Sequence, residues 1–453
     1  MPTTCLNYDK KCGGCPLLAL PYREQLNQKQ ARLQGLLGGF APVRAVQGMA
    51  EPYHYRNKAI ASFAMQHGRL VCGLYAEGTH RVLPSADCLL QEEILNKTLA
   101  AVLEAARTCR WTAYDEDRGT GLLRHTVLRS SGDGKVLVTL VTPGADLPGS
   151  KNFCAALRKK APWVVSIVQN INPTRSSAVL GNREKPLWGP GFVLDTLCGL
   201  QFAISSRSFY QVNRTQTEVL YKKALELARL TGRETVVDAY CGIGTIGLCA
   251  APHAKQVIGV ERNPAAVRDA AANARRNKLA NARFVCADAA ALPFDSGSID
   301  TIIMNDAMEH VARPEAVLAE CLRVLAPGGR LFLNFPPIHH PFGAHLHDLI
   351  YIPWVHLFFS EKTQIEAYKA LCKTVHDGDD RIAFRISKRP DGTEYFSYIN
   401  HMTIKRFDRI LKSLGVKPVY RHTVPLRPFL RPLCHMRPAR EFFTKMVVCV
   451  FEK

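Results

Sequence analysis

The residues with the clearest chemical potential lie in a short turn that contains two glycines. A β-like run ends at Asp238, and Tyr240, Cys241, Gly242 and Gly244 follow before a helix-like segment begins. Glycine has no Cβ, so the backbone N–H groups of such a turn can approach a ligand closely. This order of elements suits a nucleoside cofactor. Dinucleotide sites use a similar device with the spacing G-x-G-x-x-G, which differs from the spacing here.

Further polar residues fall at the ends of the next β-like runs. Glu261 ends the second run, where its carboxylate can accept hydrogen bonds from both hydroxyls of a ribose. Asp288 ends the third run and is placed to hold an adenine amino group. Because the carboxyl ends of parallel strands form the ligand-binding edge of a sheet, we expect these residues to share one site. Tyr240 and Asn305, at the end of the fourth run, are assigned to the same site.

Four cysteines form a second set of candidate residues. Cys5, Cys12 and Cys15 follow the spacing C-x6-C-x2-C, and Cys88 lies far along the chain. Four thiolates can hold either an iron-sulfur cluster or a zinc ion, and the spacing does not choose between them. The alternative is a set of unligated thiols, which the C-x2-C pair with a third cysteine close by disfavours. A bound group could still serve only to staple the domain.

The elements that would position these residues divide the chain into two parts. Residues 1–200 carry short β-like runs separated by Gly, Pro and Asp, which predict a sheet-rich α+β domain. In residues 201–453 helix and strand patterns alternate, which predicts a parallel α/β domain. Its strands are expected at residues 235–240, 256–261, 282–288, 301–306, 329–335, 417–424 and 445–451, with an amphipathic helix at 402–415. The apolar segment at about 336–397 is interpreted as a lid.

The composition indicates a globular protein whose positive charge would attract polyanions. The 453 residues are 47% hydrophobic, and 59 Lys and Arg against 39 Asp and Glu give a net charge of +20. Such an excess attracts nucleic-acid phosphates, although it could also serve solubility alone. We expect a cytoplasmic location, because no apolar run approaches the roughly 18 residues of a membrane span and the N-terminus lacks the apolar centre of a signal peptide. The fifteen cysteines favour reduced thiols and ligands over disulfides.

From Cys5 to about Asp288 the chain resembles the RNA uracil-C5 methyltransferases of the iron-sulfur type that lack a TRAM domain. The resemblance rests on the motifs CGGCPLLALPYREQLNQK, YHYRNKA, DCLLQ, SFYQVN and VDAYCGIGTIGL. It implies a class I Rossmann-like methyltransferase domain, S-adenosyl-L-methionine as methyl donor, a [4Fe-4S] cluster on the four cysteines, and rRNA or tRNA as partner. It also implies that Gln211, in SFYQVN, approaches the cofactor and the reacting base. The basic stretch from Arg56 to Lys58 would contact RNA, or be a solvated loop.

Beyond Asp288 this resemblance stops. Uracil-C5 chemistry needs a thiolate that adds to C6 and a base that removes the C5 proton. Phe335 stands where the family's nucleophilic cysteine ends the fifth strand, and Glu441 lies several residues too early for the base. The segment from about residue 289, with LPFDSGSIDTIIMNDAMEHV and VLAPGGRLFLNFPP, resembles instead the broad class I small methyltransferases (methyltransferase type 11). Asp306 and Glu309 face the expected transfer site, as catalytic groups or as helix caps.

Three functional hypotheses follow from the sequence. We favour an S-adenosylmethionine-dependent methyltransferase that acts on RNA. The first alternative is a small-molecule or lipid methyltransferase that retains the N-terminal part as a binding or structural module, which the apolar segment after Pro336 supports. The second is a non-catalytic RNA-binding protein that still holds the cofactor. A fold alone does not fix a reaction, so the site must decide between them.

Overall fold

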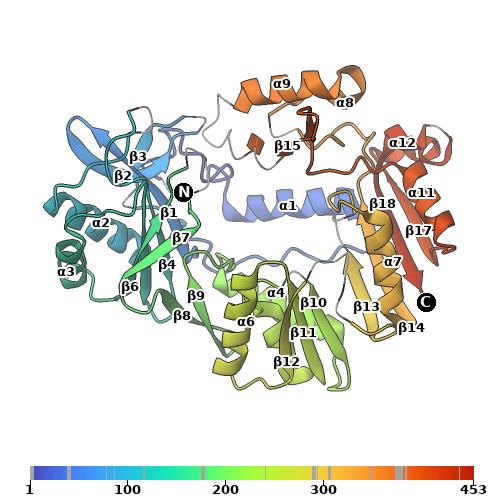
Figure 1. The fold of residues 1–453 in the computed structure, drawn as a ribbon, viewed down its shortest axis with the longest axis horizontal. Helices are drawn as coiled ribbons and strands as arrows, with labels where there is room; N and C mark the ends of the chain where they lie inside the picture. The colour runs from blue at the N-terminus through green and yellow to red at the C-terminus, as the bar shows by residue number, and fades with distance from the viewer. Residues whose placement is uncertain are drawn as a thin grey trace. The chain divides into compact units, whose positions relative to one another are not determined.

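The computed structural model of the chain forms two compact units (Figure 1). Unit 1 consists of residues 1–231, 242–252 and 268–280, and unit 2 of residues 232–241, 253–267 and 281–453. The predicted division into residues 1–200 and 201–453 stays a prediction. The structure describes residues 5–37, 42–77, 79–85, 87–115, 118–174, 179–239, 241–287, 292, 294–304, 308–346, 349–372, 381–382, 385–437 and 439–453.

Unit 1 is built on a seven-stranded sheet of order β3-β2-β1-β4-β5-β6-β7. Its strands are β1 (Lys58–Gln66), β2 (Arg69–Tyr75), β3 (Val82–Pro84), β4 (His125–Ser130), β5 (Val136–Thr142), β6 (Val164–Ile171) and β7 (Arg183–Trp188). All neighbours are antiparallel except β5 and β6, which α3 (Ser150–Lys160) connects. A buried cluster of apolar residues joins this sheet to α2 (Glu93–Thr108) and α3. A separate helix, α1 (Tyr22–Leu37), precedes the sheet.

A hairpin and a helix precede the glycine turn in the chain, and two further helices follow it. The hairpin joins β8 (Phe192–Leu197) and β9 (Leu200–Ser205) through Cys198 and Gly199, both with positive φ, as a two-residue hairpin turn requires. Asn213 begins α4 (Arg214–Ala228), because its side chain accepts a hydrogen bond from the Gln216 N–H. Then follow α5 (Thr245–Ala250) with the 3-10 helix η1 (Ala251–His253), and α6 (Pro264–Arg276).

The two larger sheets of unit 2 have the strand patterns that the sequence predicts, and two short strands, described below, form a separate pair. The first, β12-β11-β10, is parallel and comprises β10 (Thr235–Ala239), β11 (Gln256–Glu261) and β12 (Ala282–Cys286). The second, β13-β14-β18-β17, comprises β13 (Ile299–Met304), β14 (Leu325–Phe335), β17 (Tyr420–Pro425) and β18 (Thr444–Glu452). Here β13 and β14 are parallel, while β17 and β18 are antiparallel to their neighbours.

Strands β10 and β13 approach each other in unit 2 but belong to different hydrogen-bonded sheets. The chain builds outward from β10 to β12 on one side and from β13 to β14 on the other. This reversal of direction is the topological switch point at which open α/β sheets bind ligands. The predicted α/β class, with a sheet-rich region before a Rossmann-like one, is confirmed.

Apolar side chains at helical spacing fix the helices on the second sheet. Helix α7 (Pro314–Val324) and helix α11 (Ile404–Ser413) contribute buried residues to a core that also holds β14 and β18. In α11 these residues are Ile404, Phe407, Ile410 and Leu411, which recur on one face as the sequence predicts. The 3-10 helix η2 (Pro428–His435) and α12 (Arg440–Phe443) lie between β17 and β18 in the chain.

The segment interpreted as a lid has a small core of its own. It contains α8 (Val355–Phe358), α9 (Glu361–Cys372), β15 (Ile386–Lys388) and β16 (Glu394–Phe396) around buried residues such as Tyr368. Whether this segment closes over a site stays a prediction.

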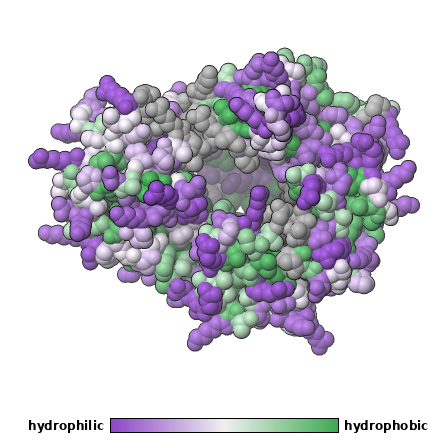
Figure 2. Space-filling view, viewed as in Figure 1, coloured by the Kyte–Doolittle hydropathy of each residue, from purple (hydrophilic) through white to green (hydrophobic). Residues whose placement is uncertain are grey.

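Hydrophilic residues cover much of the face in Figure 2, which agrees with the charged composition. Among the described residues no helix is both long and apolar enough to cross a bilayer.

Candidate functional site

Asp238 and Glu261 lie on one face of the parallel sheet at its carboxyl end. Asp238 on β10 pairs in register with Gly259 on β11, and Glu261 follows two residues later, so period-two alternation places it on the face of Gly259. Burial, followed by the charges of both carboxylates, raises the pKa of the Cys241 thiol to about 12. Both carboxylates therefore lie close enough to Cys241 to act on its charge, and their assignment to the cofactor stays a prediction.

The backbone of the turn requires its glycines. Gly242 and Gly244 have φ of 55° and 79°, in the left-handed region that residues with a Cβ adopt only at a cost. Gly244 is the residue before α5. Within unit 1, the buried Asn273 donates a hydrogen bond from Nδ2 to the Ile243 carbonyl and accepts one from the Ala203 N–H. Sequence reasoning missed Asn273, because an amide within a helical pattern carries no local signal of such a role.

Several predicted site residues lie outside the described part of the chain. They are Tyr240, Asp288, Asn305 and Asp306. Their assignment to the cofactor site, or to catalysis for Asp306, stays a prediction. Glu261 is described, and its Oε1 accepts a hydrogen bond from the Asn263 N–H at 2.8 Å. This bond orients the carboxylate at the end of β11.

Glu309, the second catalytic candidate, is a buried carboxylate with an imidazole beside it. It is 4% exposed, and its Oε1 lies 3.7 Å from Nε2 of His310. The other ring nitrogen of His310 is 2.7 Å from the Tyr398 carbonyl oxygen. Asn400 fixes the backbone here by donating from Nδ2 to the carbonyls of Met308 and Val311. The catalytic assignment of Glu309 stays a prediction.

The end of the fifth strand is part of the hydrophobic core. Phe335 is 0% exposed, and its ring centroid lies 4.8 Å from that of Phe407. Glu441, the acidic residue before the last strand, is also buried, and its two oxygens accept hydrogen bonds from the N–H groups of Ile404 and Lys405 at 2.9 and 2.7 Å. Glu441 therefore caps the first turn of α11.

Cysteines elsewhere in unit 2 do not supply a ready nucleophile at this strand. Burial raises the pKa of Cys321 to about 12 and that of Cys449 to about 11, and it also raises the pKa of Cys434. Cys372 is buried as well. A thiol is nucleophilic as its thiolate, so these residues are core thiols, as the sequence indicates. Cys286 is exposed, but it ends β12 rather than β14.

The four N-terminal cysteines lie near one another. Burial, followed by the charges of Cys88, Cys12 and Cys5, raises the pKa of the Cys15 thiol to about 11. The local backbone is a series of turns, in which the Cys5 carbonyl accepts from the Tyr8 N–H. Among the described residues no group of three or more His, Cys, Asp or Glu side chains is already arranged as metal ligands. The assignment of a cluster to these cysteines stays a prediction.

Cations of unit 1 gather beside the SFYQVN segment. Burial, followed by the charges of Arg129 and Arg56, lowers the pKa of Lys58 to about 8, and burial lowers that of Arg129 to about 10. Arg129 donates to the Ser206 and Ser208 carbonyls. An anion such as an RNA phosphate would relieve this concentration of positive charge.

Asn57 connects the same basic stretch to Gln211. Its N–H donates to the Val212 carbonyl at 2.9 Å, and its Nδ2 donates to the Gln211 carbonyl at 3.0 Å. The Gln211 side chain is half-buried. The sequence indicated the basic stretch and Gln211 separately, whereas their connection, and the part that Arg129 plays in it, needed the fold.

The switch point, the glycine turn and the carboxylates on β10 and β11 define an S-adenosylmethionine-dependent methyltransferase. A methyltransferase-domain family model matches residues 237–333. This match runs from β10 to β14, so it begins well before residue 289, where the sequence placed the start of the second resemblance.

Comparison with known proteins gives the family. An uncharacterized RNA methyltransferase of Halalkalibacterium halodurans is 40% identical over 75% of this chain and 81% of its own length. One from Bacillus cereus is 39% identical over 72% of this chain and 78% of its own length. The chain belongs to this family of RNA methyltransferases.

A solved structure has the same fold. It is the tRNA (uracil-54, C5)-methyltransferase of Pyrococcus abyssi in complex with S-adenosyl-L-homocysteine, with a TM-score of 0.56. Its identity to this chain is 22%, over 71% of this chain and 76% of that one. At this identity the likeness concerns the fold alone.

Proposed function

We propose that the chain transfers a methyl group from S-adenosylmethionine to RNA, either rRNA or tRNA. We further propose that no covalent bond forms between the RNA and a residue at the end of the fifth strand during this transfer. Membership of the RNA methyltransferase family supports RNA as the acceptor, as do the net charge of +20 and the cations around Lys58. The donor supplies an electrophilic methyl on its sulfonium when bound. The N-terminal resemblance implies uracil C5 as the acceptor, whereas the end of the fifth strand favours a different atom.

The burial of Phe335 is the main observation that supports a non-covalent mechanism. A covalent route needs a thiolate at an accessible strand end, and this position holds a fully buried ring against Phe407. Glu441 does not serve as the base of the covalent route, because both its oxygens accept hydrogen bonds from the start of α11. An acceptor that is already nucleophilic, such as a base or sugar heteroatom, needs only positioning and proton removal.

The residues divide between donor and acceptor. Asp238, Gly242, Gly244 and Glu261 would hold the donor, together with Tyr240, Asp288 and Asn305. Gln211 would face both the donor and the reacting base. Asp306 and Glu309 would receive the acceptor proton, with His310 beside Glu309.

The first test is methyl transfer with radiolabelled S-adenosylmethionine and total cell extract, separated into RNA, lipid and small molecules. We expect label in RNA, and much less with the Asp238→Ala variant at the same donor concentration. Label in lipid alone, or in small molecules alone, would refute RNA as the acceptor. The second test uses RNA that carries 5-fluorouridine, which traps enzymes that form the covalent uracil adduct. A protein-RNA adduct that survives denaturation would refute the non-covalent mechanism.

We further propose that Cys5, Cys12, Cys15 and Cys88 hold a [4Fe-4S] cluster. The electrostatic effect of three of these thiols on Cys15 supports a common site. Iron and acid-labile sulfide should be found in anaerobically purified protein, and should be lost in Cys12→Ser. Cys109→Ser is the matched control, because Cys109 is half-buried but lies outside the set. Zinc in place of iron, or no metal, would refute the proposal.

A further inference from the structure

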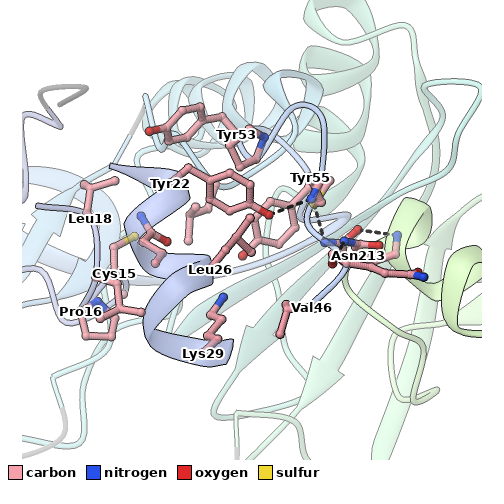
Figure 3. A pocket seen from close by; sticks show the side chains of 18 residues that line it. Cys15, Pro16, Leu18, Tyr22, Leu26, Lys29, Val46, Tyr53, Tyr55 and Asn213 are labelled. Carbon is pink, nitrogen blue, oxygen red and sulfur yellow. Dashed lines mark hydrogen bonds between the residues drawn. The ribbon is translucent and has the colours of Figure 1, made fainter. Parts of the chain in front are cut away.

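Unit 1 contains a pocket that the methyl-transfer chemistry does not use. Its volume is about 320 Å³, and its walls come from α1, the turn after Cys15, the segment from Val46 to Tyr55, and the start of α4. On α1 the lining residues are Tyr22, Gln25, Leu26 and Lys29, which fall on one helical face by their spacing. In Figure 3 Tyr22 and Leu26 point from α1 toward Tyr55 and Asn213. Of the four N-terminal cysteines, Cys15 alone lines the pocket.

The walls combine flat aromatic rings with fixed polar groups. Three tyrosines, Tyr22, Tyr53 and Tyr55, line the pocket. The Tyr22 hydroxyl accepts a hydrogen bond from the Met49 N–H at 2.8 Å, which holds the ring in place and leaves its hydrogen to be donated.

The amide groups of the opposite wall are held as well. Asn213 accepts from the Gln216 N–H, and Gln216 donates from Nε2 to the Gln47 carbonyl at 3.1 Å. Fixed donors and acceptors of this kind suit the edge of a planar heterocycle.

The charge of the lining favours a ligand with a phosphate. Lys29 is the charged residue among the lining side chains, and the described walls contain no Asp or Glu. Lys29 lines the pocket and is exposed, so its ammonium would meet a backbone phosphate. A volume near 320 Å³ lies at the small end of ligand pockets and accommodates one nucleoside rather than a duplex.

We infer that this pocket binds one unpaired nucleobase of the RNA, stacked on tyrosine with the adjoining phosphate against Lys29, at a position other than the methylated nucleotide. The inference rests on the proposed action on RNA. Single-stranded RNA is recognised through unstacked bases that lie on aromatic side chains. The pocket would therefore contribute to the choice of RNA site, while the residues around Asp238 contribute the methyl donor.

The test compares two probes in fluorescence anisotropy, a short fluorescent oligouridylate and an abasic ribose-phosphate oligomer of equal length. The wild-type chain should bind oligouridylate more tightly. In the double variant Tyr53→Leu and Tyr55→Leu we expect about a tenfold loss for oligouridylate and little change for the abasic oligomer, because stacking involves only the base. Tyr8→Leu is the control, since Tyr8 is a solvent-exposed tyrosine outside the lining.

Lys29 is tested separately. Lys29→Gln should weaken both probes to the same extent, whereas Arg23→Gln, on the same helix but outside the pocket lining, should not. The wild-type chain offers a check that needs no variant. Photocrosslinking with RNA that contains 4-thiouridine should mark peptides carrying Tyr22, Tyr53 or Tyr55.

The outcomes separate this inference from the proposed function. If the wild-type chain methylates RNA but binds both probes equally, the pocket does not bind a base. The same conclusion follows if no crosslink is found in these peptides. In both cases the proposed function stands. Equal losses for both probes in the tyrosine double variant would also overturn the inference. If the wild-type chain neither binds nor methylates RNA, the proposed function falls and the inference falls with it.

Discussion

The packing around Gly259 predicts that a single added methyl group will damage the cofactor site. Gly259 lies on β11 between Asp238 on β10 and Phe284 on β12 in the parallel ladder. A Cβ at this position would lie 2.3 Å from Cδ1 of Phe284 and 2.9 Å from Sγ of Cys241. Both distances are far below van der Waals contact, so the Phe284 ring and the Cys241 side chain must move in Gly259→Ala.

The size of the effect follows from two opposing terms. Overpacking in a core costs typically about 1–3 kcal/mol, and replacement of Gly by Ala returns about 0.4–1 kcal/mol by restricting the unfolded chain. We therefore expect Gly259→Ala to destabilise unit 2 by about 1–2 kcal/mol. Because Cys241 begins the turn after Asp238, its displacement should also weaken S-adenosylmethionine binding several-fold.

Urea unfolding and titration calorimetry measure the two quantities on one variant. The matched control is Gly35→Ala on α1, where nothing lies within 4 Å of an added Cβ and φ is not positive. The control should leave binding unchanged and stabilise the helix by up to about 1 kcal/mol. If Gly259→Ala unfolds at the same urea concentration as the wild-type chain and binds the cofactor equally well, our description of this packing is wrong.

Three further predictions concern named side chains. Asp238→Ala and Glu261→Ala should each bind S-adenosylmethionine at least tenfold more weakly in calorimetry, and parent-like affinity would remove them from the site. RNA affinity should fall as pH rises above about 8, because Lys58 with its lowered pKa loses its charge there and binding must restore it. In Lys58→Arg that dependence should flatten, and an unchanged slope would exclude Lys58 as the titrating group. Glu441→Gln should lower stability by about 1–2 kcal/mol in urea unfolding and leave methyl transfer by the folded protein intact, whereas selective loss of transfer would make Glu441 catalytic.

The sequence predicted the elements around the site well because their patterns are local. The runs that end at Asp238 and Glu261 are short and apolar, and both form the expected parallel strands. Strand β7 has no such local pattern, since most of its residues are exposed and its sequence shows no alternation. Strand β9 also lacks a clear local signal. The β-like pattern of β8 ends at the Cys198 turn, and β9 follows directly after it.

The contacts that define the site could not be derived from the sequence in the same way. The bonds from Asn57 to Gln211 and from Arg129 to Ser208 join positions more than seventy residues apart, so no local pattern contains them. The sequence itself shows the departure from uracil chemistry, because residue 335 is a phenylalanine and not a cysteine. It does not show the complete burial of Phe335 against Phe407, because that burial depends on where α11 packs.

The closed end of the fifth strand also limits how this chain could evolve or be engineered. A cysteine at position 335 would not create a reactive centre, because it would replace a fully buried phenylalanine and leave a cavity beside Phe407. Large-to-small changes of this kind cost roughly 3–5 kcal/mol, a large share of the stability of most domains. A path to covalent uracil methylation would therefore have to reshape the core under α11 before it installed the nucleophile, and any single-step variant would be lost to misfolding first.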